Sequence, residues 1–183
     1  MSIVDEKQAL RSQIRSARRR RSAAELDELA DALAGYAGAI PGTIVTAFLG
    51  LDGEPPTIKL VQALTQRVLL PLVQPDMDLE WAPFEGVDAI AETHHRLLEP
   101  TTPSLGLDGI ATADLILAPA LAVAADGTRL GQGGGCYDRA LTRTSAPVIA
   151  VVFDEEVVDS LPRADHDQTV QGVLTPRGGL RWF

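Results

Sequence analysis

The chain has 183 residues, of which 45% are hydrophobic and 22% charged, and its 16 basic and 25 acidic residues give a formal charge of −9. A chain of this length holds a core without disulfides or a structural metal, and its single cysteine, Cys136, has no intramolecular disulfide partner. Because no apolar run approaches the roughly 20 residues of a membrane span and none has signal-peptide length behind the N-terminal charges, we expect one soluble, cytoplasmic domain over residues 1–183.

The charge is unevenly distributed along the chain. Residues 1–21 hold seven basic and two acidic groups, a balance of 7 − 2 = +5, so the remainder carries −14. Nonspecific nucleic-acid binding needs a broad positive surface, which an acidic body does not offer. A basic segment on such a body favours a local anion site, and a solvated cationic helix face is the alternative.

The first part of the chain is predicted to form two helices. Nothing interrupts a helix from Asp5 to Arg21, and Ser22 is expected to open the second helix, because its spacing to Glu25 is that of a capping box. Apolar side chains then follow at helical intervals and should face the core: Leu26, Leu29, Leu33 and Tyr36. The sequence Pro41-Gly42 ends this helix.

Strands and helices are predicted to alternate over the rest of the chain. Strands are expected at residues 43–49, 67–73, 79–84, 114–123, 147–153 and 170–174, and helices at 57–66, 137–143 and 155–160. The segment 114–123 (DLILAPALAV) is the most apolar and should be a central strand. This alternation predicts an α/β protein with three layers, α/β/α, around a mainly parallel sheet that binds ligands at the carboxyl ends of its strands.

A glycine-rich loop follows the most apolar strand. Gly131, Gly133, Gly134 and Gly135 fill four of five positions, which costs backbone entropy and contributes no packing. Such a loop is tolerated where bare amides approach a ligand, and at the start of a helix these amides can hold phosphate, although a flexible turn is the alternative. No Lys-Ser/Thr follows the glycines, which excludes a P-loop, and their spacing does not suit a dinucleotide-binding motif.

Charged residues elsewhere in the chain are candidates to complete this site. Lys7 and Arg11 lie four residues apart on one helix face, with Arg15 one turn further, so they can close over a polyphosphate. Asp138 directly follows the glycines, where a carboxylate can hold Mg²⁺ on phosphate oxygens or cap the helix instead. Asp167 is a candidate second carboxylate for the same ion.

Other reactive residue types have simpler interpretations. Cys136 lies among the glycines with no histidine close in sequence to activate it, so a packing role is favoured over a nucleophilic one. His94 and His95 have no other plausible metal ligand at close spacing and are expected at the surface.

These residues together resemble the 5-formyltetrahydrofolate cyclo-ligase family, also called 5,10-methenyltetrahydrofolate synthetases, over nearly the whole chain. The block from Gly127 to Arg139 is the most specific part of the resemblance. The other matching pieces fall in the right order: Lys7-x-x-Leu10-Arg11, residues 48–57 (FLGLDGEPPT), Leu70-Pro71, Glu99-Pro100, Asp167 and residues 173–176 (VLTP).

The resemblance implies an activity and a fold. The activity is ATP- and Mg²⁺-dependent closure of 5-formyltetrahydrofolate to 5,10-methenyltetrahydrofolate, through a phosphorylated formyl intermediate and with release of ADP and phosphate. The fold is that of the ribose-phosphate isomerase and CoA-transferase-like group. We expect a monomer whose partners are 5-formyltetrahydrofolate and ATP, without nucleic acid or membrane.

The resemblance also implies roles for individual residues, and Lys7, Arg129 and Tyr137 are the expected catalytic groups. ATP is expected at Lys7, Arg11, Arg129, Leu130, Gly131, Gln132, Gly133, Gly134, Gly135, Cys136 and Tyr137. The folate is expected at Leu51, Glu54, Pro56, Gln132, Gly133, Gly134, Gly135 and Cys136. Mg²⁺ is expected at Asp138 and Asp167.

Three positions depart from the family pattern. Many relatives have an acidic residue where Pro56 stands and an aromatic where Cys136 stands, and Gln171 replaces a common acid. Because a proline side chain cannot make the polar contact of an acid at position 56, Glu54 is expected to make it instead.

Two rival functions stay open. One is a sugar-phosphate isomerase or CoA-transferase-like enzyme of the same fold, against which ATP dependence would argue. The other is a non-catalytic RNA-associated protein that uses the basic helix of residues 11–21, which steeply salt-dependent RNA binding without ATP hydrolysis would favour.

Overall fold

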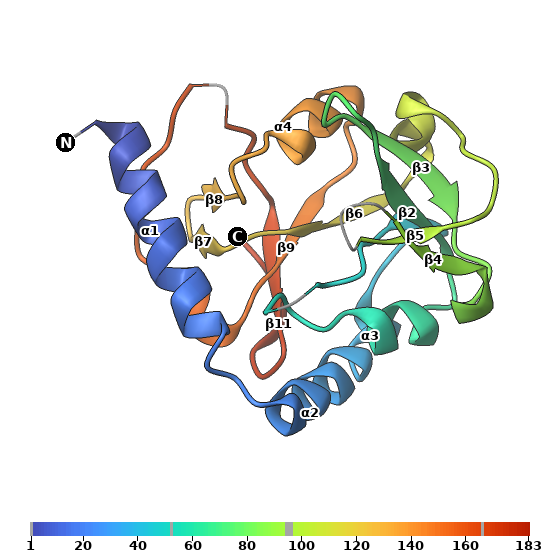
Figure 1. The fold of residues 1–183 in the computed structure, drawn as a ribbon, viewed down its shortest axis with the longest axis horizontal. Coiled ribbons are helices and arrows are strands. Elements are labelled where there is room, and N and C mark those ends of the chain that lie inside the picture. The colour runs from blue at the N-terminus through green and yellow to red at the C-terminus, as the bar shows by residue number, and fades with distance from the viewer. Residues whose placement is uncertain (1, 52, 94–96, 166) are drawn as a thin grey trace.

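The computed structural model describes residues 2–51, 53–93, 97–165 and 167–183, and at its centre is a seven-stranded sheet (Figure 1). The strand order is β12-β11-β9-β6-β1-β2-β3. The strand bounds are β1 Ile44–Thr46, β2 Arg67–Val73, β3 Leu79–Pro83, β6 Leu115–Pro119, β9 Val148–Val151, β11 Gly172–Thr175 and β12 Gly179–Trp182. The five inner strands are parallel, whereas β12 and β3 pair antiparallel at the two edges, which confirms the mainly parallel sheet.

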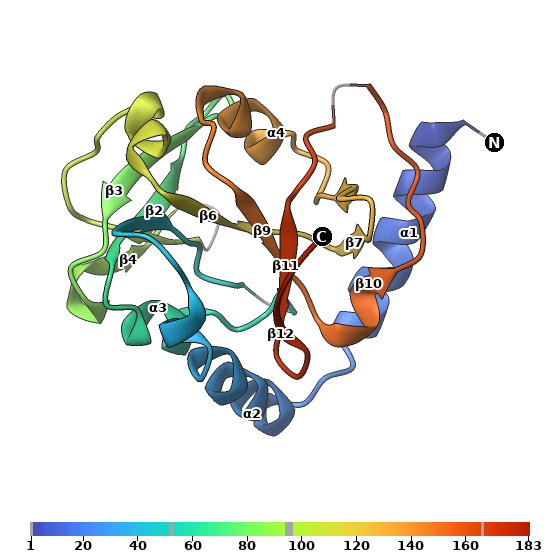
Figure 2. The same cartoon turned by 180° about the vertical axis from the view of Figure 1, so that it is seen from behind.

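Both faces of this sheet are hydrophobic, because successive strand residues point to opposite sides. Leu115 and Leu117 of β6 belong to a core cluster shared with α2 (Ala23–Ala34) and α3 (Ile58–Ala63). Ile116 and Ala118 belong to the opposite cluster, shared with α4 (Cys136–Ala140) and the 3₁₀ helices η3 (Leu107–Thr112) and η4 (Leu141–Arg143). Figures 1 and 2 show the sheet between these two groups, so the three-layer prediction is confirmed.

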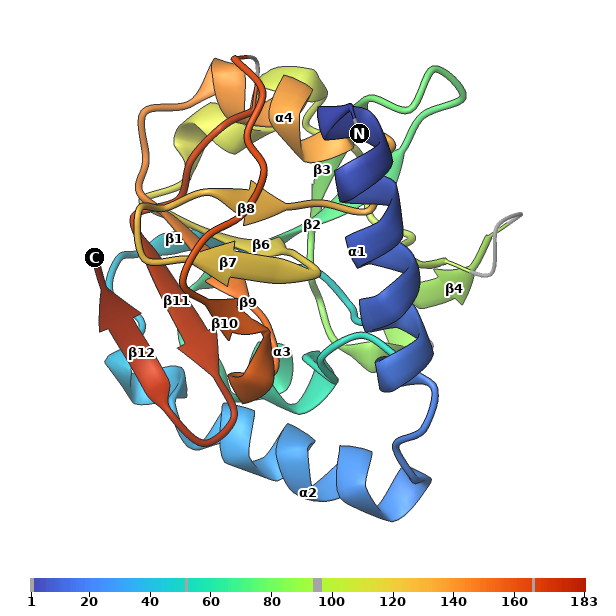
Figure 3. The ribbon, with the colours of Figure 1, turned by 90° about the vertical axis from the view of Figure 1, so that its left-hand side faces the viewer.

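Helix α1 (Ile3–Arg18) lies outside these layers, beside a second sheet of three short strands (Figure 3). This small sheet has the order β10-β7-β8, with bounds Val157–Val158, Ala122–Ala124 and Arg129–Leu130. Leu10 and Ile14 of α1 pack against a cluster of Leu121, Ala122 and Leu130. The apolar face of α1 is thereby buried on the small sheet, which fixes where its basic side chains lie.

The most apolar segment is not one strand, as predicted, but two strands in different sheets. β6 ends at Pro119 and β7 begins at Ala122. Proline has no N–H for a further ladder bond, and two residues later the Leu121 N–H donates to the Leu130 carbonyl at 2.7 Å. The turn between them joins the central sheet to the small one.

The helix predicted at residues 155–160 is also wrong. A 3₁₀ turn, η5 (Asp154–Glu156), is followed by β10, which pairs parallel with β7. Val157 and Val158 are β-branched and favour the strand. Helix α1 begins at Ile3 rather than at Asp5, because Ser2 and Asp5 form its capping box, and it ends at Arg18 rather than at Arg21.

Several other local features complete the fold. Half of the predicted capping box of α2 is present: the Ser22 hydroxyl accepts from the Glu25 N–H at 3.2 Å, whereas the Glu25 carboxylate makes no return bond to the Ser22 N–H in the described ranges and lies 3.7 Å from Arg21. Strand β12, the short antiparallel pair β4 (Ile90–Glu92) and β5 (Leu98–Pro100), and the 3₁₀ turns η1 (Ala37–Ala39) and η2 (Val87–Ala89) were not predicted.

Candidate active site

A cavity of about 1100 Å³ opens where β1, β2 and β6 end at their carboxyl termini. Phe48 and Leu49 follow β1, Val73 ends β2 and Pro119 ends β6, and all four line the cavity. This is the edge at which parallel sheets bind ligands. The cavity therefore lies where the alternation of strands and helices predicted a site.

Four stretches that are distant in sequence supply many of the other lining residues. The glycine loop between β8 and α4, the segment after β1, helix α1 and the loop before β11 all contribute. The residues expected at ATP, at the folate or at Mg²⁺ line this one cavity, with the exception of Pro56: Lys7, Arg11, Leu51, Glu54, Arg129, Leu130, Gly131, Gln132, Gly133, Gly134, Gly135, Cys136, Tyr137, Asp138 and Asp167.

Pro56 lies in the segment that supports the cavity, outside its lining. The neighbouring Thr57 accepts a hydrogen bond from the Gly50 N–H at 3.0 Å, and its hydroxyl donates to the Phe48 carbonyl. These bonds close the turn that presents Leu51 and Glu54. Gln171 lies at the opposite end of the sheet, where its Oε1 accepts from the Val148 N–H at 2.8 Å.

The cavity contains two pairs of opposite charges. Lys7, only 8% exposed, forms an ion pair with Asp167, whose Oδ2 also accepts from the Ala164 N–H at 2.7 Å. Arg129, 5% exposed, donates from Nη2 to the Asp138 Oδ1 at 2.6 Å. Both expected metal ligands thus lie in the cavity, and each contacts a basic side chain.

Two polar groups of the lining are buried without a hydrogen-bond partner in the described part of the chain. They are the Nε of Arg129 and the hydroxyl of Tyr137. The Tyr137 ring packs edge-on against Trp81, with centroids 6.2 Å apart, and burial raises the pKa of its phenol well above the usual range. Buried polar groups in native proteins are nearly always paired, so these two are candidates to contact a ligand.

Helix α1 holds the glycine loop by two arginine contacts. Arg11 donates from Nε to the Gly131 carbonyl at 2.9 Å, and Arg15 donates to the main-chain and side-chain oxygens of Gln132 at 2.7–3.0 Å. The loop needs glycine at Gly133 and Gly135, whose φ values of +107° and +69° are disfavoured for other residues. Since α4 has only five residues, the loop amides matter here more than a helix dipole.

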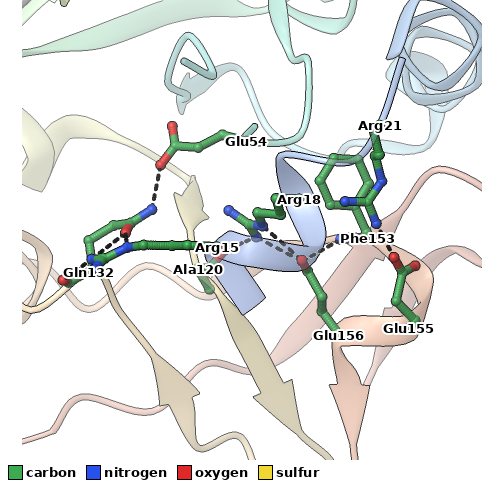
Figure 4. Close-up of polar contacts among 9 residues, drawn as sticks. All are labelled: Arg15, Arg18, Arg21, Glu54, Ala120, Gln132, Phe153, Glu155 and Glu156. Atoms are coloured by element: carbon green, nitrogen blue, oxygen red, sulfur yellow. Dashed lines mark hydrogen bonds and ion pairs between the residues drawn. The ribbon is translucent and has the colours of Figure 1, made fainter. Parts of the chain in front are cut away.

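Two arginines in the C-terminal part of the basic segment, Arg18 and Arg21, pack on the protein body, whereas Arg19 and Arg20 are exposed. Arg18, 3% exposed, donates to both carboxylate oxygens of Glu156 at 2.7 Å and to the Ala120 carbonyl at 2.6 Å. Arg21 stacks 3.7 Å from the centroid of the Phe153 ring and pairs with Glu155 (Figure 4). Two of the arginines that the RNA-binding alternative would use, Arg18 and Arg21, are therefore occupied by contacts within the protein.

The hairpin between β2 and β3 also borders the cavity, which the sequence did not predict. Arg139 of α4 donates to the Met77 carbonyl at 2.6 Å, and Arg143 donates to both carboxylate oxygens of Asp78 at 2.8 and 2.6 Å. This pairing lowers the pKa of Asp78. The only sequence signal was the short acidic turn between two strands, which carries no information about its partner.

Net charge differs between the cavity and the whole chain. The lining residues that the structure describes include five basic side chains (Lys7, Arg11, Arg129, Arg139, Arg143) and four acidic ones (Glu54, Glu99, Asp138, Asp167), a balance of 5 − 4 = +1. The chain as a whole carries −9. The local anion site expected from the sequence is consistent with this difference.

Cys136 has the properties of a packing residue. It is half-buried against the cluster that contains Trp81, and burial raises the pKa of its thiol. A protonated thiol is a poor nucleophile. The expected surface histidines His94 and His95, like His166, lie outside the described residues.

The fold and the cavity define the chain as a three-layer α/β/α enzyme with its site at the carboxyl edge of the sheet. A family model described as the 5-formyltetrahydrofolate cyclo-ligase family matches residues 3–176, and the chain belongs to this family. The 5-formyltetrahydrofolate cyclo-ligase of Mycolicibacterium smegmatis is 39% identical over 186 residues, which cover 93% of this chain and 95% of that protein. The family resemblance and the enzyme class expected from the sequence are thereby confirmed.

Two solved structures share the fold. The 5,10-methenyltetrahydrofolate synthetase of Aquifex aeolicus superposes with a TM-score of 0.81 at 22% identity, over 96% of this chain and 92% of that one. The 5,10-methenyltetrahydrofolate synthetase of Mycoplasma pneumoniae gives 0.71 at 20% identity, over 92% and 97%. In the described ranges, the structure contains no helix that is both long and apolar enough to cross a membrane.

Proposed function

We propose that this enzyme closes 5-formyltetrahydrofolate to 5,10-methenyltetrahydrofolate, using ATP and Mg²⁺ and releasing ADP and phosphate. The observation that carries this proposal is that the residues expected at ATP and those expected at the folate, except Pro56, line one cavity. Its volume of about 1100 Å³ is near the upper end of the range of about 300–1000 Å³ usual for ligand pockets.

The glycine loop fits a polyphosphate. A Cβ at Gly131 would meet no atom within 4 Å and the φ of this residue is not in the left-handed region, so neither packing nor backbone strain requires glycine there. A ligand that approaches the loop closely would explain why residue 131 is a glycine. The unpartnered Arg129 Nε and the buried cation Lys7 are the groups we assign to the phosphate oxygens.

Asp138 and Asp167 fit Mg²⁺ when substrate oxygens supply the other ligands. The described residues include no group of three or more His, Cys, Asp or Glu side chains able to hold a metal ion, so no dedicated protein cage is available there. Mg²⁺ commonly uses one or two carboxylates together with phosphate oxygens and water. Asp138 and Asp167 would hold the ion, which would neutralise charge on the phosphates.

The reaction then needs positioning and charge neutralisation, without a protein nucleophile. The formyl oxygen bonds to the γ-phosphorus of ATP as the bond to ADP breaks, which turns a poor leaving group into a phosphate ester. The nitrogen at position 10 attacks the activated carbon and loses its proton, and the carbon–oxygen bond breaks to release phosphate. Lys7, Arg11 and Arg129 stabilise the negative charge on the transferred group.

The proposal is tested by mixing the purified protein with 5-formyltetrahydrofolate, Mg²⁺ and ATP and following the long-wavelength absorbance of the methenyl product. We expect product only when ATP is present, and ATP-independent product would contradict the proposal.

A substrate with ¹⁸O in the formyl group tests the phosphorylated intermediate. The label should appear in the released phosphate, and its absence there would rule out phosphorylation of the formyl oxygen.

The same residues bear on the oligomeric state and the cellular compartment of the enzyme. One chain supplies all groups assigned to both ligands, which supports a monomer. The free thiol of Cys136 supports a reducing, cytoplasmic compartment. No observation favours an isomerase, a CoA-transferase-like enzyme or an RNA-binding protein over this function.

A further inference from the structure

Arg15 lies outside the cavity lining but is connected to it through Gln132. Its guanidinium donates from Nε to the Gln132 Oε1 at 3.0 Å and from Nη2 to the same oxygen at 2.8 Å. A further bond from Nη2 reaches the Gln132 main-chain carbonyl at 2.7 Å. Three donor contacts therefore hold one residue of the glycine loop, in both its backbone and its side chain.

These contacts determine which way the Gln132 amide points. Because the Oε1 accepts from Arg15, the amide NH₂ faces the other direction, and its Nε2 donates to the Glu54 Oε1 at 2.9 Å (Figure 4). A flipped amide would present its oxygen to the Glu54 carboxylate, and the two acceptors would repel. Arg15 thus selects the orientation in which the glycine loop can bind Glu54.

Glu54 is held from its other side by its own turn. Its Oε2 accepts from the Leu51 N–H at 3.2 Å, and the Glu54 N–H donates to the Leu51 carbonyl at 2.7 Å. The carboxylate therefore has one oxygen on the turn and one on Gln132. Glu54, Leu51 and Gln132 all line the cavity, whereas Arg15 does not.

We infer that Arg15 is a positioning residue for the folate: through Gln132 it holds the carboxylate of Glu54 in the orientation that receives the substrate. This inference rests on the proposed function. The chain of contacts runs from α1 through the loop assigned to ATP to the turn assigned to the folate.

The test is a double-mutant cycle with Arg15→Met and Glu54→Gln, with Arg20→Met as the matched control. Arg15→Met keeps much of the side-chain length and removes all three donor contacts, whereas Arg20 is exposed just beyond the end of α1. We expect Arg15→Met to raise the KM for 5-formyltetrahydrofolate about fivefold to twentyfold and to change the KM for ATP less than about threefold, whereas Arg20→Met should change neither.

The cycle separates positioning from simple support of the fold. When Glu54 has already been changed to Gln, Arg15→Met should raise the KM for the folate less than twofold further, because the group that it positions is gone. Arg15→Lys, which keeps one charged donor, should recover part of the affinity. Equal effects of Arg15→Met with and without Glu54→Gln would overturn the inference, as would equal increases in KM for both substrates.

A readout without turnover distinguishes this inference from the proposed function. Urea unfolding of the wild type, the two single variants and the double variant should show non-additive changes in the unfolding equilibrium constant. This coupling is expected although Arg15 and Glu54 are connected only through Gln132. Additive unfolding changes would overturn the contact chain itself. If the unfolding changes are non-additive but the wild-type enzyme forms no methenyl product, the contact chain is present and both the folate assignment and the proposed function are wrong.

Discussion

At the scale of single residues, the site is built from opposite charges that already face each other. Lys7 contacts Asp167 and Arg129 contacts Asp138, and three of these four side chains are less than 12% exposed. Such pairs need a strong competitor to separate, because each partner left alone in a buried site is costly. Under the proposed function, a nucleotide that binds with Mg²⁺ would supply an anion for each cation and a cation for each carboxylate.

Lys7 offers the sharpest residue-scale test of this arrangement. Changing Lys7 to Ala should raise the dissociation constant for ATP about tenfold to hundredfold, because a charged contact to phosphate is worth roughly 1.5–3 kcal/mol, and should change folate affinity less than twofold. Calorimetric titration with each ligand measures both. Lys59, the other lysine, pairs with Asp27 and Asp31 outside the cavity, so Lys59→Ala is the control. Equal weakening of both ligands would contradict the assignment.

Tyr137 gives a prediction in which stability and activity change in different directions. Its buried hydroxyl has no hydrogen-bond partner within the described ranges, so Tyr137→Phe should leave the free energy of unfolding unchanged or raise it by up to about 1 kcal/mol. If the hydroxyl contacts a ligand, kcat/KM should nevertheless fall about tenfold. Thermal unfolding and initial rates measure the two effects, and a destabilised variant would show that the hydroxyl has a structural partner.

The residues of the site could be predicted from the sequence to the extent that a local motif carries them. The glycine loop, Asp138 and Lys7-x-x-x-Arg11 are short patterns, and they line the cavity. The contacts of Arg15 and Arg18 could not be predicted, because their partners Gln132 and Glu156 lie 117 and 138 residues away. No local spacing encodes such a pairing.

At the scale of elements, the hairpin between β2 and β3 is joined to η4 by the Asp78–Arg143 pair. Both carboxylate oxygens accept from the guanidinium, and Asp78 is 8% exposed. Because the pairing lowers the pKa of Asp78 in the folded state, the pair stabilises the fold at pH values above the unfolded pKa of about 3.9 and ceases to do so as the pH falls through the lowered value.

Asp78→Asn should therefore lower the free energy of unfolding by about 1–3 kcal/mol between pH 5 and 8. The difference from the wild type should shrink below pH 4, where protonation of Asp78 weakens the pair in the wild type as well. Urea unfolding across this pH range is the measurement, and Asp88→Asn, on an exposed residue, is the control. A difference that stays constant down to pH 3 would exclude the carboxylate as its cause.

Element predictions succeeded where periodicity was long and failed where an element was short. Strand β2 has the predicted bounds, whereas β7 and β10 have only three and two residues. Their pairing with each other was invisible in the sequence, because they are more than 30 residues apart and β7 continues an apolar run. Strand β12 was missed for a similar reason, since at the edge of the sheet its apolar pattern is weak.

At the scale of the whole molecule, the hydrophobic clusters are connected through shared strands. The two large clusters lie on opposite faces of the same sheet, and β7 of the small sheet directly follows β6. We propose that residues 1–183 form one cooperative domain, so urea unfolding followed by tryptophan fluorescence and by far-UV circular dichroism should give coincident transitions. Two separated transitions would show that α1 and the small sheet unfold independently.

The central claim is that ATP cleavage and ring closure occur together in this cavity. The most direct test counts ADP released against methenyl product formed in the same reaction, with 5-formyltetrahydrofolate present and absent. The account predicts one ADP per methenyl product and negligible ADP without the folate. Product without ADP, or ADP release that does not depend on the folate, would contradict it.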